Sequence, residues 1–306
     1  MNILFIIDPP RELILKKDSS FAMMKEAVKQ KHQVYFCLQH DLYIDSNQLF
    51  CRVNRFELDL FLNHSKAYET FSISHFNVLF MRKDPPVDQA YLHTTYLLDI
   101  AEKSNVKILN KPSSIRSWNE KISILQFDTL IPKTLVTANP DIVKQFFKAH
   151  GDIILKPLDG MGGKNIFRVS EFEKNLNVIL EIMTKHGRQM IMAQKYIPEI
   201  KLGDKRIIII HGKPFPYALA RIPMEGETRG NIASGGQGLA QLLSQRDIEI
   251  ATLVGEKLLK EGLYFVGIDV IGDYLTEINV TSPTGIVELF EQTKHNPAEL
   301  IINALH

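Results

Sequence analysis

F-V-G-I-D-V-I-G-D-Y-L-T-E-I-N-V-T-S-P, residues 265–283, consists of two short apolar runs around a Gly-Asp break. This pattern is typical of a β-hairpin. Three polar side chains, Asp269, Glu277 and Asn279, interrupt the apolar runs. Glu277 and Asn279 are two residues apart, so on a strand they share one face.

The loop length determines whether Asp269 joins them. A three-residue loop, Gly272-Asp273-Tyr274, places Asp269 opposite Glu277, whereas a two-residue loop places them on opposite faces. Two facing carboxylates repel each other, and a divalent cation between them relieves that repulsion. Carboxylate and amide oxygens suit Mg²⁺ or Mn²⁺, which commonly also bind substrate phosphates. The stretch therefore predicts a metal site with a nucleotide; the alternative is a solvent-facing strand edge with ordinary charges.

The composition is that of a globular protein. The chain has 306 residues, of which 45% are hydrophobic and 23% charged, and its net charge is +1. These values give no reason to expect a nucleic-acid or membrane partner, and no apolar run is long enough to span a membrane. The start of the chain does not resemble a signal peptide. Cys37 and Cys51 have no metal or redox spacing, which favours reduced thiols in a cytoplasmic protein.

The amino-terminal third alternates between strand and helix patterns. Residues 2–7 and 33–38 read as strands, and Ser19 and Ser20 are candidate N-caps for a helix from Phe21 to about Gln30. This order predicts a parallel sheet whose ligands lie at the carboxyl ends of its strands. Residues 41–75 are expected to hold short strands, a loop and some helix.

A further strand, residues 78–81, leads into Arg82-Lys83-Asp84-Pro85-Pro86. The two cations are well placed to hold a carboxylate, although a solvated loop explains them equally well. Residues 113–127, which include Lys121, are expected to form a helix.

The middle of the chain has a glycine-rich turn. A strand at 152–156 ends in Lys156, and the sequence P-L-D-G-M-G-G-K follows at 157–164. Three glycines in four positions suit a loop whose N–H groups wrap a phosphate, but a plain hairpin is nearly as good an explanation. The strand at 190–194 ends in Gln194-Lys195-Tyr196-Ile197, a segment that could border an adenine ring.

A long segment rich in glycine, residues 222–239, has no apolar periodicity. A long loop of this kind in a compact domain is commonly a lid or disordered, and its Glu227 and Arg229 favour a mobile lid.

Together these motifs resemble the ATP-grasp ligases, and more narrowly the bacterial glutathione synthetase family. The resemblance covers nearly the whole chain, with residues 41–75 matching weakly. It rests on these segments: K-K-D-S-S-F-A-M (16–23), M-R-K-D-P-P (81–86), N-K-P (110–112), I-L-K-P-L-D-G-M-G-G (154–163), G-D-K-R (203–206), L-A-R-I-P (219–223), E-T-R-G-N (227–231) and T-E-I-N-V-T-S-P (276–283).

The resemblance implies an α/β ATP-grasp fold in three parts. These are an amino-terminal α/β substrate domain at 1–120, a central lid domain at 121–200 and a carboxy-terminal domain at 201–306. The implied reaction joins γ-glutamylcysteine to glycine, with ATP consumed through an acyl phosphate and Mg²⁺ or Mn²⁺ as the metal. The family also suggests a homotetramer.

The resemblance assigns a role to each candidate residue. The implied ATP-binding residues are Lys121, Lys156, Gly160, Met161, Gly162, Gly163, Gln194, Lys195, Tyr196, Ile197 and Asp204. Arg206, Arg221 and Arg229 are the implied catalytic residues, Ser19, Ser20, Arg82, Arg206 and Arg221 hold substrate, and Asp269, Glu277 and Asn279 hold the metal.

Two other interpretations stay open from the sequence. One is an ATP-grasp ligase with other substrates, such as a D-alanine ligase or a glutamate-adding enzyme; the segments at 16–23 and 81–86 argue against it. The other is a nucleotide-binding module without turnover, which the intact Asp269, Glu277 and Asn279 disfavour.

Overall fold

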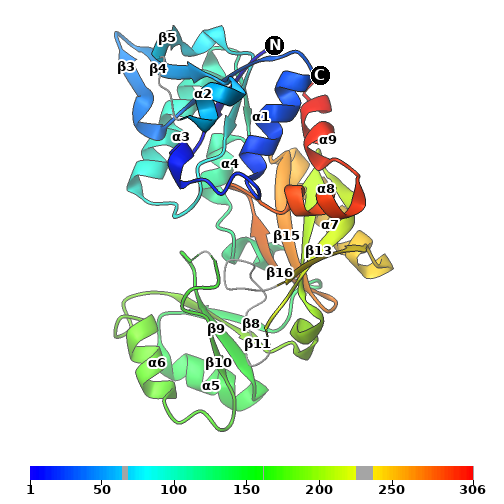
Figure 1. Ribbon diagram of the computed structural model, residues 1–306. Helices are drawn as coiled ribbons and strands as arrows, with labels where there is room; N and C mark the ends of the chain where they lie inside the picture. Colours follow the sequence, from blue (N-terminus) through cyan, green and yellow to red (C-terminus); the bar gives the residue numbers. More distant parts are fainter. Residues whose placement is uncertain (64–67, 161, 225–236, 306) are drawn as a thin grey trace.

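Three β-sheets form the framework of the protein. The computed structural model describes residues 1–63, 68–160, 162–224 and 237–305, and each sheet comes from a different third of the chain (Figure 1). In Figure 1 the first sheet lies at the top, the third in the middle and the second at the bottom, and both chain ends lie at the top.

The first sheet has a parallel centre, as the alternation of strand and helix predicted. Its order is β3-β4-β2-β1-β6-β7, with β5 paired to β4. The strands β2, β1, β6 and β7 run parallel, and β3, β4 and β5 extend the sheet with antiparallel pairs. The strand bounds are β1 (Asn2–Ile6), β2 (Gln33–Cys37), β3 (Leu42–Asp45), β4 (Gln48–Arg55), β5 (Tyr68–Ser72), β6 (Val78–Met81) and β7 (Lys107–Leu109).

Helices cover this sheet, and their caps differ from the expectation. The helices are α1 (Ser19–Lys29), α2 (Leu58–Leu62), α3 (Gln89–Lys103) and α4 (Pro112–Ser117), with short 3-10 turns at Pro10–Glu12, Gln39–Asp41 and Ile73–His75. The cap of α1 is Asp18, which accepts a hydrogen bond from the Phe21 N–H at 2.6 Å. The prediction of serine caps was therefore wrong, because the carboxylate one residue earlier satisfies that N–H and leaves Ser19 and Ser20 in the first turn.

The helix expected at 113–127 is broken into two pieces. α4 ends at Ser117, and a 3-10 helix η4 (Ile122–Gln126) begins after Lys121. Between them, Asn119 Oδ1 accepts hydrogen bonds from the N–H groups of Lys121 and Ile122 at 3.1 and 3.0 Å. An asparagine that bonds its own following backbone competes with helix continuation, which explains the break.

The second sheet is antiparallel and has a core of its own. Its strands are ordered β10-β9-β11-β8, and α5 (Pro140–His150) and α6 (Leu176–Met183) cover one face. Their apolar side chains, including Val143 and Leu180, pack on Ile153, Leu155 and Ile191. The strand bounds are β8 (Thr134–Thr137), β9 (Ile153–Pro157), β10 (Phe167–Val169) and β11 (Ile191–Lys195).

The third sheet is also antiparallel, in the order β14-β13-β12-β15-β16. A 3-10 turn, η5 (Pro198–Leu202), precedes β12 (Asp204–Ile210), β13 (Lys213–Ile222), β14 (Gln237–Leu242), β15 (Phe265–Ile271) and β16 (Tyr274–Asn279). Because β14 begins at Gln237, the loop predicted at 222–239 is shorter at both ends. Its residues 225–236, with Glu227 and Arg229, lie outside the described residues.

Helices pack on both faces of the third sheet. Ile207 and Ile209 pack with α7 (Gln245–Lys260), whereas Ile208 and Ile210 face α8 (Ile286–Thr293) and α9 (Pro297–Asn303). α9 also packs against α1. In Figure 1 the carboxy-terminal α9 therefore lies beside the first domain. The first and third sheets share apolar clusters, and the boundaries at 120 and 200 stay a prediction.

Asn110 joins the first sheet to the third. Its Nδ2 donates to the carbonyls of Phe265 and Val280, both at 2.8 Å. Its Oδ1 accepts from the N–H groups of Tyr264 and Phe265 at 2.8 and 2.9 Å. Three of these four hydrogen bonds are buried and the one from Tyr264 is partly buried, so the side chain satisfies backbone groups that the junction would otherwise leave unpaired.

No helix among the described residues is long and apolar enough to cross a membrane.

Candidate functional site

A cavity of about 300 Å³ lies between the second and third sheets, with one edge formed by the first domain. Along β12, Ile208 and Ile210 point into the shared core, and Arg206 and Asp204 continue the same face to where it meets the second sheet. The cavity therefore begins where this sheet face changes from apolar to charged side chains.

The hairpin predicted at 265–283 carries three cavity residues on one face. Asp269 lies opposite Glu277, and Gly267 lies opposite Asn279. The predicted pairing of Asp269 with Glu277 is therefore confirmed. All three polar residues line the cavity.

The predicted cause of this pairing was wrong. Ile271 pairs with Tyr274, so the loop has two residues, Gly272 and Asp273, rather than three. A β-bulge at Thr276 restores the pairing, because β16 contains one more residue than β15 between the turn and Glu277. The Thr276 hydroxyl donates to the Asp269 carbonyl at 3.1 Å across the bulge.

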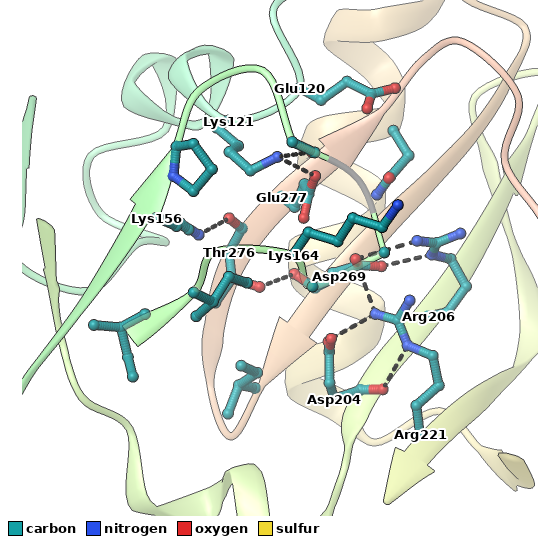
Figure 2. Close-up of a pocket in the computed structure, with 18 of the residues that line it drawn as sticks. Glu120, Lys121, Lys156, Lys164, Asp204, Arg206, Arg221, Asp269, Thr276 and Glu277 are labelled. Carbon is teal, nitrogen blue, oxygen red and sulfur yellow. Dashed lines mark hydrogen bonds and ion pairs between the residues drawn. The ribbon is translucent and has the colours of Figure 1, made fainter. Parts of the chain in front are cut away.

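Two arginines hold Asp269 from neighbouring strands (Figure 2). Arg206 Nε lies 2.5 Å from Asp269 Oδ1, and an Arg221 guanidinium nitrogen lies 2.9 Å from Oδ2. The same Arg221 nitrogen lies 2.6 Å from Asp204 Oδ2. These four side chains form a buried network in which each charge has a partner, as burial of charge requires.

Burial and neighbouring charge shift the two carboxylates in opposite directions. Burial would raise the pKa of Asp269, but the guanidinium groups of Arg206 and Arg221 outweigh it and hold the pKa below its usual range. Burial raises the pKa of Asp204 to about 6, although Arg221 opposes the rise. Asp269 is thus the permanent anion of the pair.

Two lysines approach the hairpin from outside the third sheet. Lys121 Nζ donates to the Gly160 carbonyl at 2.6 Å and to Glu277 Oε1 at 3.1 Å. Lys156 Nζ, from β9, donates to the Thr276 carbonyl at 3.0 Å. Burial lowers the pKa of Lys156 to about 8, while the Glu277 carboxylate acts against that shift.

The glycine-rich turn joins two antiparallel strands and borders the cavity. Gly160, Gly162 and Gly163 line it, and Met161 lies outside the described residues. Gly162 and Gly163 both have positive φ, 68° and 72°, a conformation that favours glycine. Lys164, the last residue of the glycine-rich motif, also lines the cavity, although no role was predicted for it.

The predicted adenine border lies at the end of β11. Gln194, Lys195, Tyr196 and Ile197 all line the cavity. The Tyr196 N–H is already bonded to the Asp152 carbonyl at 2.9 Å. The guanidinium of Arg168 lies 3.9 Å from the centre of the Tyr196 ring, so that ring is stacked from one side.

The predicted substrate residues of the first domain do not line the cavity. Arg82 is buried, with Nε 3.0 Å from Ser20 Oγ and Nη2 2.9 Å from the Pro283 carbonyl. Ser19 is buried in the first turn of α1. Their substrate role stays a prediction. Arg82 contacts the segment that carries two cavity residues, because it donates to the Pro283 carbonyl, between Ser282 and Thr284.

Two acidic cavity residues were missed from the sequence. Glu120 accepts hydrogen bonds from the Val280 and Thr281 N–H groups and from the Thr281 hydroxyl, at 3.1, 3.2 and 2.8 Å. Burial raises its pKa, and the Glu277 charge adds to the rise. Asp84 also lines the cavity. A glutamate beside Lys121 and an aspartate after two cations carry no pattern that separates them from surface charges.

Comparison with known proteins covers the whole chain. A family model described as "Prokaryotic glutathione synthetase, N-terminal domain" matches residues 1–116, and one described as "Prokaryotic glutathione synthetase, ATP-grasp domain" matches residues 120–294. The glutathione synthetase of Nitrosomonas europaea is 48% identical over 100% of this chain and 97% of its own length. That of Pseudomonas aeruginosa is 50% identical over 93% of this chain and 90% of its own.

Solved structures with low identity share the fold. D-cycloserine synthetase DcsG has a TM-score of 0.69 at 13% identity, covering 99% of this chain and 98% of that chain. The ATP-grasp ligase PsnB, complexed with minimal precursor, Mg and ADP, has a TM-score of 0.66 at 13% identity, covering 99% and 96%. At such identity the similarity concerns the fold alone, and it confirms the predicted ATP-grasp fold class.

Proposed function

Because this chain belongs to the prokaryotic glutathione synthetase family and is an ATP-dependent ligase, we propose that its cavity joins γ-glutamylcysteine to glycine through an acyl phosphate. One observation carries the assignment of roles. Asp269, Glu277 and Asn279 share one sheet face and meet Lys121 and Lys156 at one cavity.

The cations and the glycine-rich turn are assigned to ATP. Lys121 and Lys156 neutralise the α- and β-phosphates, and Gly160–Gly163 cover them. Residues 194–197 border the adenine, and Asp204 meets the ribose. Phosphoryl transfer needs positioning and charge neutralisation more than covalent help from the protein, which is what such a cavity supplies.

The oxygen donors of the hairpin fit a divalent metal. Two carboxylates and one amide are a donor set for Mg²⁺ or Mn²⁺. Asn279 Nδ2 is buried without a hydrogen-bond partner among the described residues, so this donor is available to a ligand oxygen. The atom of Asn279 that would hold a metal is its Oδ1, because the amide nitrogen donates hydrogen bonds. When bound, the metal supplies charge neutralisation for the β- and γ-phosphate oxygens. Asp269, Glu277 and Asn279 would hold it.

The arginines are assigned to the acyl-transfer step. A carboxylate oxygen of γ-glutamylcysteine attacks the γ-phosphorus, the bond to ADP breaks, and an acyl phosphate forms. The neutral amine of glycine then attacks the carbonyl carbon, phosphate leaves with the electron pair, and the amine proton is lost. Arg206 and Arg221 stabilise the negative charge on the tetrahedral oxygen and the glycine carboxylate. We also assign a catalytic role to Arg229, which lies outside the described residues.

A coupled ADP-release assay tests the reaction. ADP release should require ATP, γ-glutamylcysteine, glycine and Mg²⁺ together, and each omission should reduce it to background. ADP release with D-alanine in place of both γ-glutamylcysteine and glycine would point to another ATP-grasp ligase. ATP binding without any release would revive the non-catalytic module.

The proposal extends to the cellular compartment and the subunit number. We expect the protein to act in the cytoplasm, as its two buried free thiols, Cys37 and Cys51, favour. The family resemblance suggests a homotetramer, and exposed apolar side chains on α2, Leu58, Leu60 and Leu62, support an interface there. Light scattering coupled to size-exclusion chromatography measures the subunit number.

A further inference from the structure

The segment after β6 presents a carboxylate to the cavity, although the sequence pattern favoured its cations. Lys83 Nζ lies 2.8 Å from Asp8 Oδ1 and donates to the Asp84 carbonyl at 2.8 Å. Arg82 is buried and bonded to Ser20 and the Pro283 carbonyl. Both cations are therefore already engaged, Lys83 by Asp8 of the first domain and Arg82 by Ser20 and by Pro283 of the carboxy-terminal part.

Asp84 is held in place by these same contacts. Its N–H donates to Asp8 Oδ2 at 2.8 Å, and its carbonyl accepts from Lys83, so the backbone is fixed on both sides. Its carboxylate has no hydrogen bond or ion pair with any described residue, and Asp84 lines the cavity. Burial lowers the pKa of Arg82 and the charge of Asp84 acts against that shift, but no described residue bonds the Asp84 carboxylate oxygens directly. A preorganised carboxylate without a direct cation contact is a binding group for a positively charged ligand.

We propose that Asp84 binds the α-ammonium group of the γ-glutamyl end of the first substrate, and so selects γ-glutamyl compounds. This inference rests on the proposed function. ATP contributes only negative charge, so the cationic groups available to Asp84 are the ammonium groups of γ-glutamylcysteine and glycine.

The position of Asp84 favours the γ-glutamyl ammonium. The amine of glycine must touch the carbon of the acyl phosphate, beside the Asp269 and Glu277 hairpin of the third sheet. Asp84 comes from the first domain, on a different wall of the cavity. In γ-glutamylcysteine the α-ammonium is at the opposite end from the reacting cysteine carboxylate, so it can meet Asp84 while the carboxylate stays beside Asp269 and Glu277.

A metal ion is a weaker candidate for Asp84. Divalent cations take several oxygen donors, and the donor set proposed for one, Asp269, Glu277 and Asn279, belongs to the hairpin of the third sheet. An ammonium group, by contrast, is satisfied by one carboxylate and nearby hydroxyl groups. Thr281 and Ser282, which line the same cavity, provide such hydroxyls.

The experiment pairs Asp84→Asn with glutarylcysteine, the analogue of γ-glutamylcysteine that lacks the α-amino group. The wild-type protein should use the analogue with a kcat/KM lower by roughly ten- to a hundredfold, the range for one hydrogen bond to a charged group. Asp84→Asn should raise KM for γ-glutamylcysteine by the same factor, leave KM for ATP and glycine within about twofold, and use both acyl substrates equally well.

Several outcomes would overturn the inference. Equal use of both substrates by the wild type would show that the ammonium is not recognised. Wild-type discrimination retained in Asp84→Asn would place the recognition elsewhere, and a raised KM for glycine would reassign Asp84 to the second substrate. Asp128→Asn, an exposed carboxylate outside the cavity, is the matched control and should behave like the wild type.

The two proposals can fail separately. If the wild type releases no ADP with γ-glutamylcysteine and glycine, the proposed function fails and this inference with it. If the wild type is active but its substrate preference is the same with and without Asp84, only this inference fails.

Discussion

Lys121, Arg206 and Arg221 already pair with the carboxylates assigned to the metal. A buried carboxylate without a counter-charge is costly, so these cations stabilise the anions of the free protein. A divalent ion that enters must share Glu277 with Lys121 and Asp269 with the two arginines. On the proposed assignment, metal binding would therefore rearrange the ion pairs of Glu277 and Asp269.

Glu277→Gln tests the metal assignment at a single residue. The substitution keeps the side-chain shape but removes the charge that pairs with Lys121, so we expect kcat/KM to fall by at least about a hundredfold. The thermal unfolding midpoint should change little, because the side chain is partly exposed. Near-normal ADP release would contradict the assignment. Glu249→Gln on the exposed face of α7, paired to Arg246, should leave activity unchanged.

Lys156 should make ATP binding sensitive to pH. Burial lowers its pKa to about 8, so above this pH the free protein loses the ammonium group proposed to hold phosphate. If only the protonated lysine holds the phosphate, KM for ATP should rise by roughly ten- to thirtyfold between pH 7.5 and 9.5, approaching about tenfold per pH unit above the pKa. Lys156→Arg should give a flatter profile, because its guanidinium stays protonated. Parallel profiles for both proteins would exclude Lys156 as the cause.

The lowered pKa of Lys156 also changes how the stability of the fold depends on pH. The unfolded lysine keeps its proton to about pH 10.4, whereas the folded one releases it near 8, so the unfolded state binds more protons between these values. The contribution of Lys156 to the free energy of unfolding therefore rises with pH in that window.

At the scale of elements, backbone geometry places the site. The bulge in β16 puts Glu277 opposite Asp269 and leaves the Thr276 carbonyl to accept from Lys156. The break between α4 and η4 similarly places Lys121 at the start of a short turn rather than in the middle of a helix. Both irregularities bring polar groups to the cavity.

Gly255 in α7 tests how closely that helix packs on the third sheet. Helix propensity favours Gly→Ala by about 1 kcal/mol. A Cβ at Gly255 would lie 2.4 Å from the Gly212 carbonyl oxygen and 3.2 Å from Ile209 Cγ2. Overpacking should outweigh propensity, so Gly255→Ala should lower the free energy of unfolding by about 1–2 kcal/mol in urea denaturation. Thr252→Ala in the same helix should leave the free energy of unfolding unchanged or raise it. A higher free energy of unfolding for Gly255→Ala would show that the turn containing Gly212 can move away from the helix.

At the scale of the whole molecule, the cavity joins three chain segments that do not all share one core. The second sheet has its own apolar core, while the first and third share clusters and are joined through Asn110. A ligand that contacts both parts should therefore stabilise them together.

ADP with Mg²⁺ should raise the thermal unfolding midpoint. At about a hundred times Kd, a ligand that binds only the folded state contributes about 2.7 kcal/mol. For a chain of this size that corresponds to a shift of roughly 5–10 °C in differential scanning fluorimetry. Chelation of the metal with EDTA should remove most of the shift. If the thermal unfolding midpoint rises equally with ADP alone, the hairpin does not hold a metal.

Much of the fold and of the candidate site can be predicted from local sequence pattern. The apolar runs and the Gly-Asp break predicted the hairpin, and the spacing of Glu277 and Asn279 predicted their shared face, because the alternation of a strand is a local property. That Asp269 joins this face depends on the bulge at Thr276. Asp84 could not be recognised in this way. Its availability depends on Asp8, 76 residues away, which occupies Lys83.

The amino-acid sequence by itself determined the fold class, the family and the chemical types that gather at the cavity, since these depend on residue identity and spacing. The tertiary structure alone decided the bulge at Thr276, the pairing of Arg206 and Arg221 with Asp269, and which side chain of Arg82-Lys83-Asp84 faces the cavity. The physical reason is that a charge selects its partner among all groups brought near it, and contacts between distant segments exist only once the chain has folded.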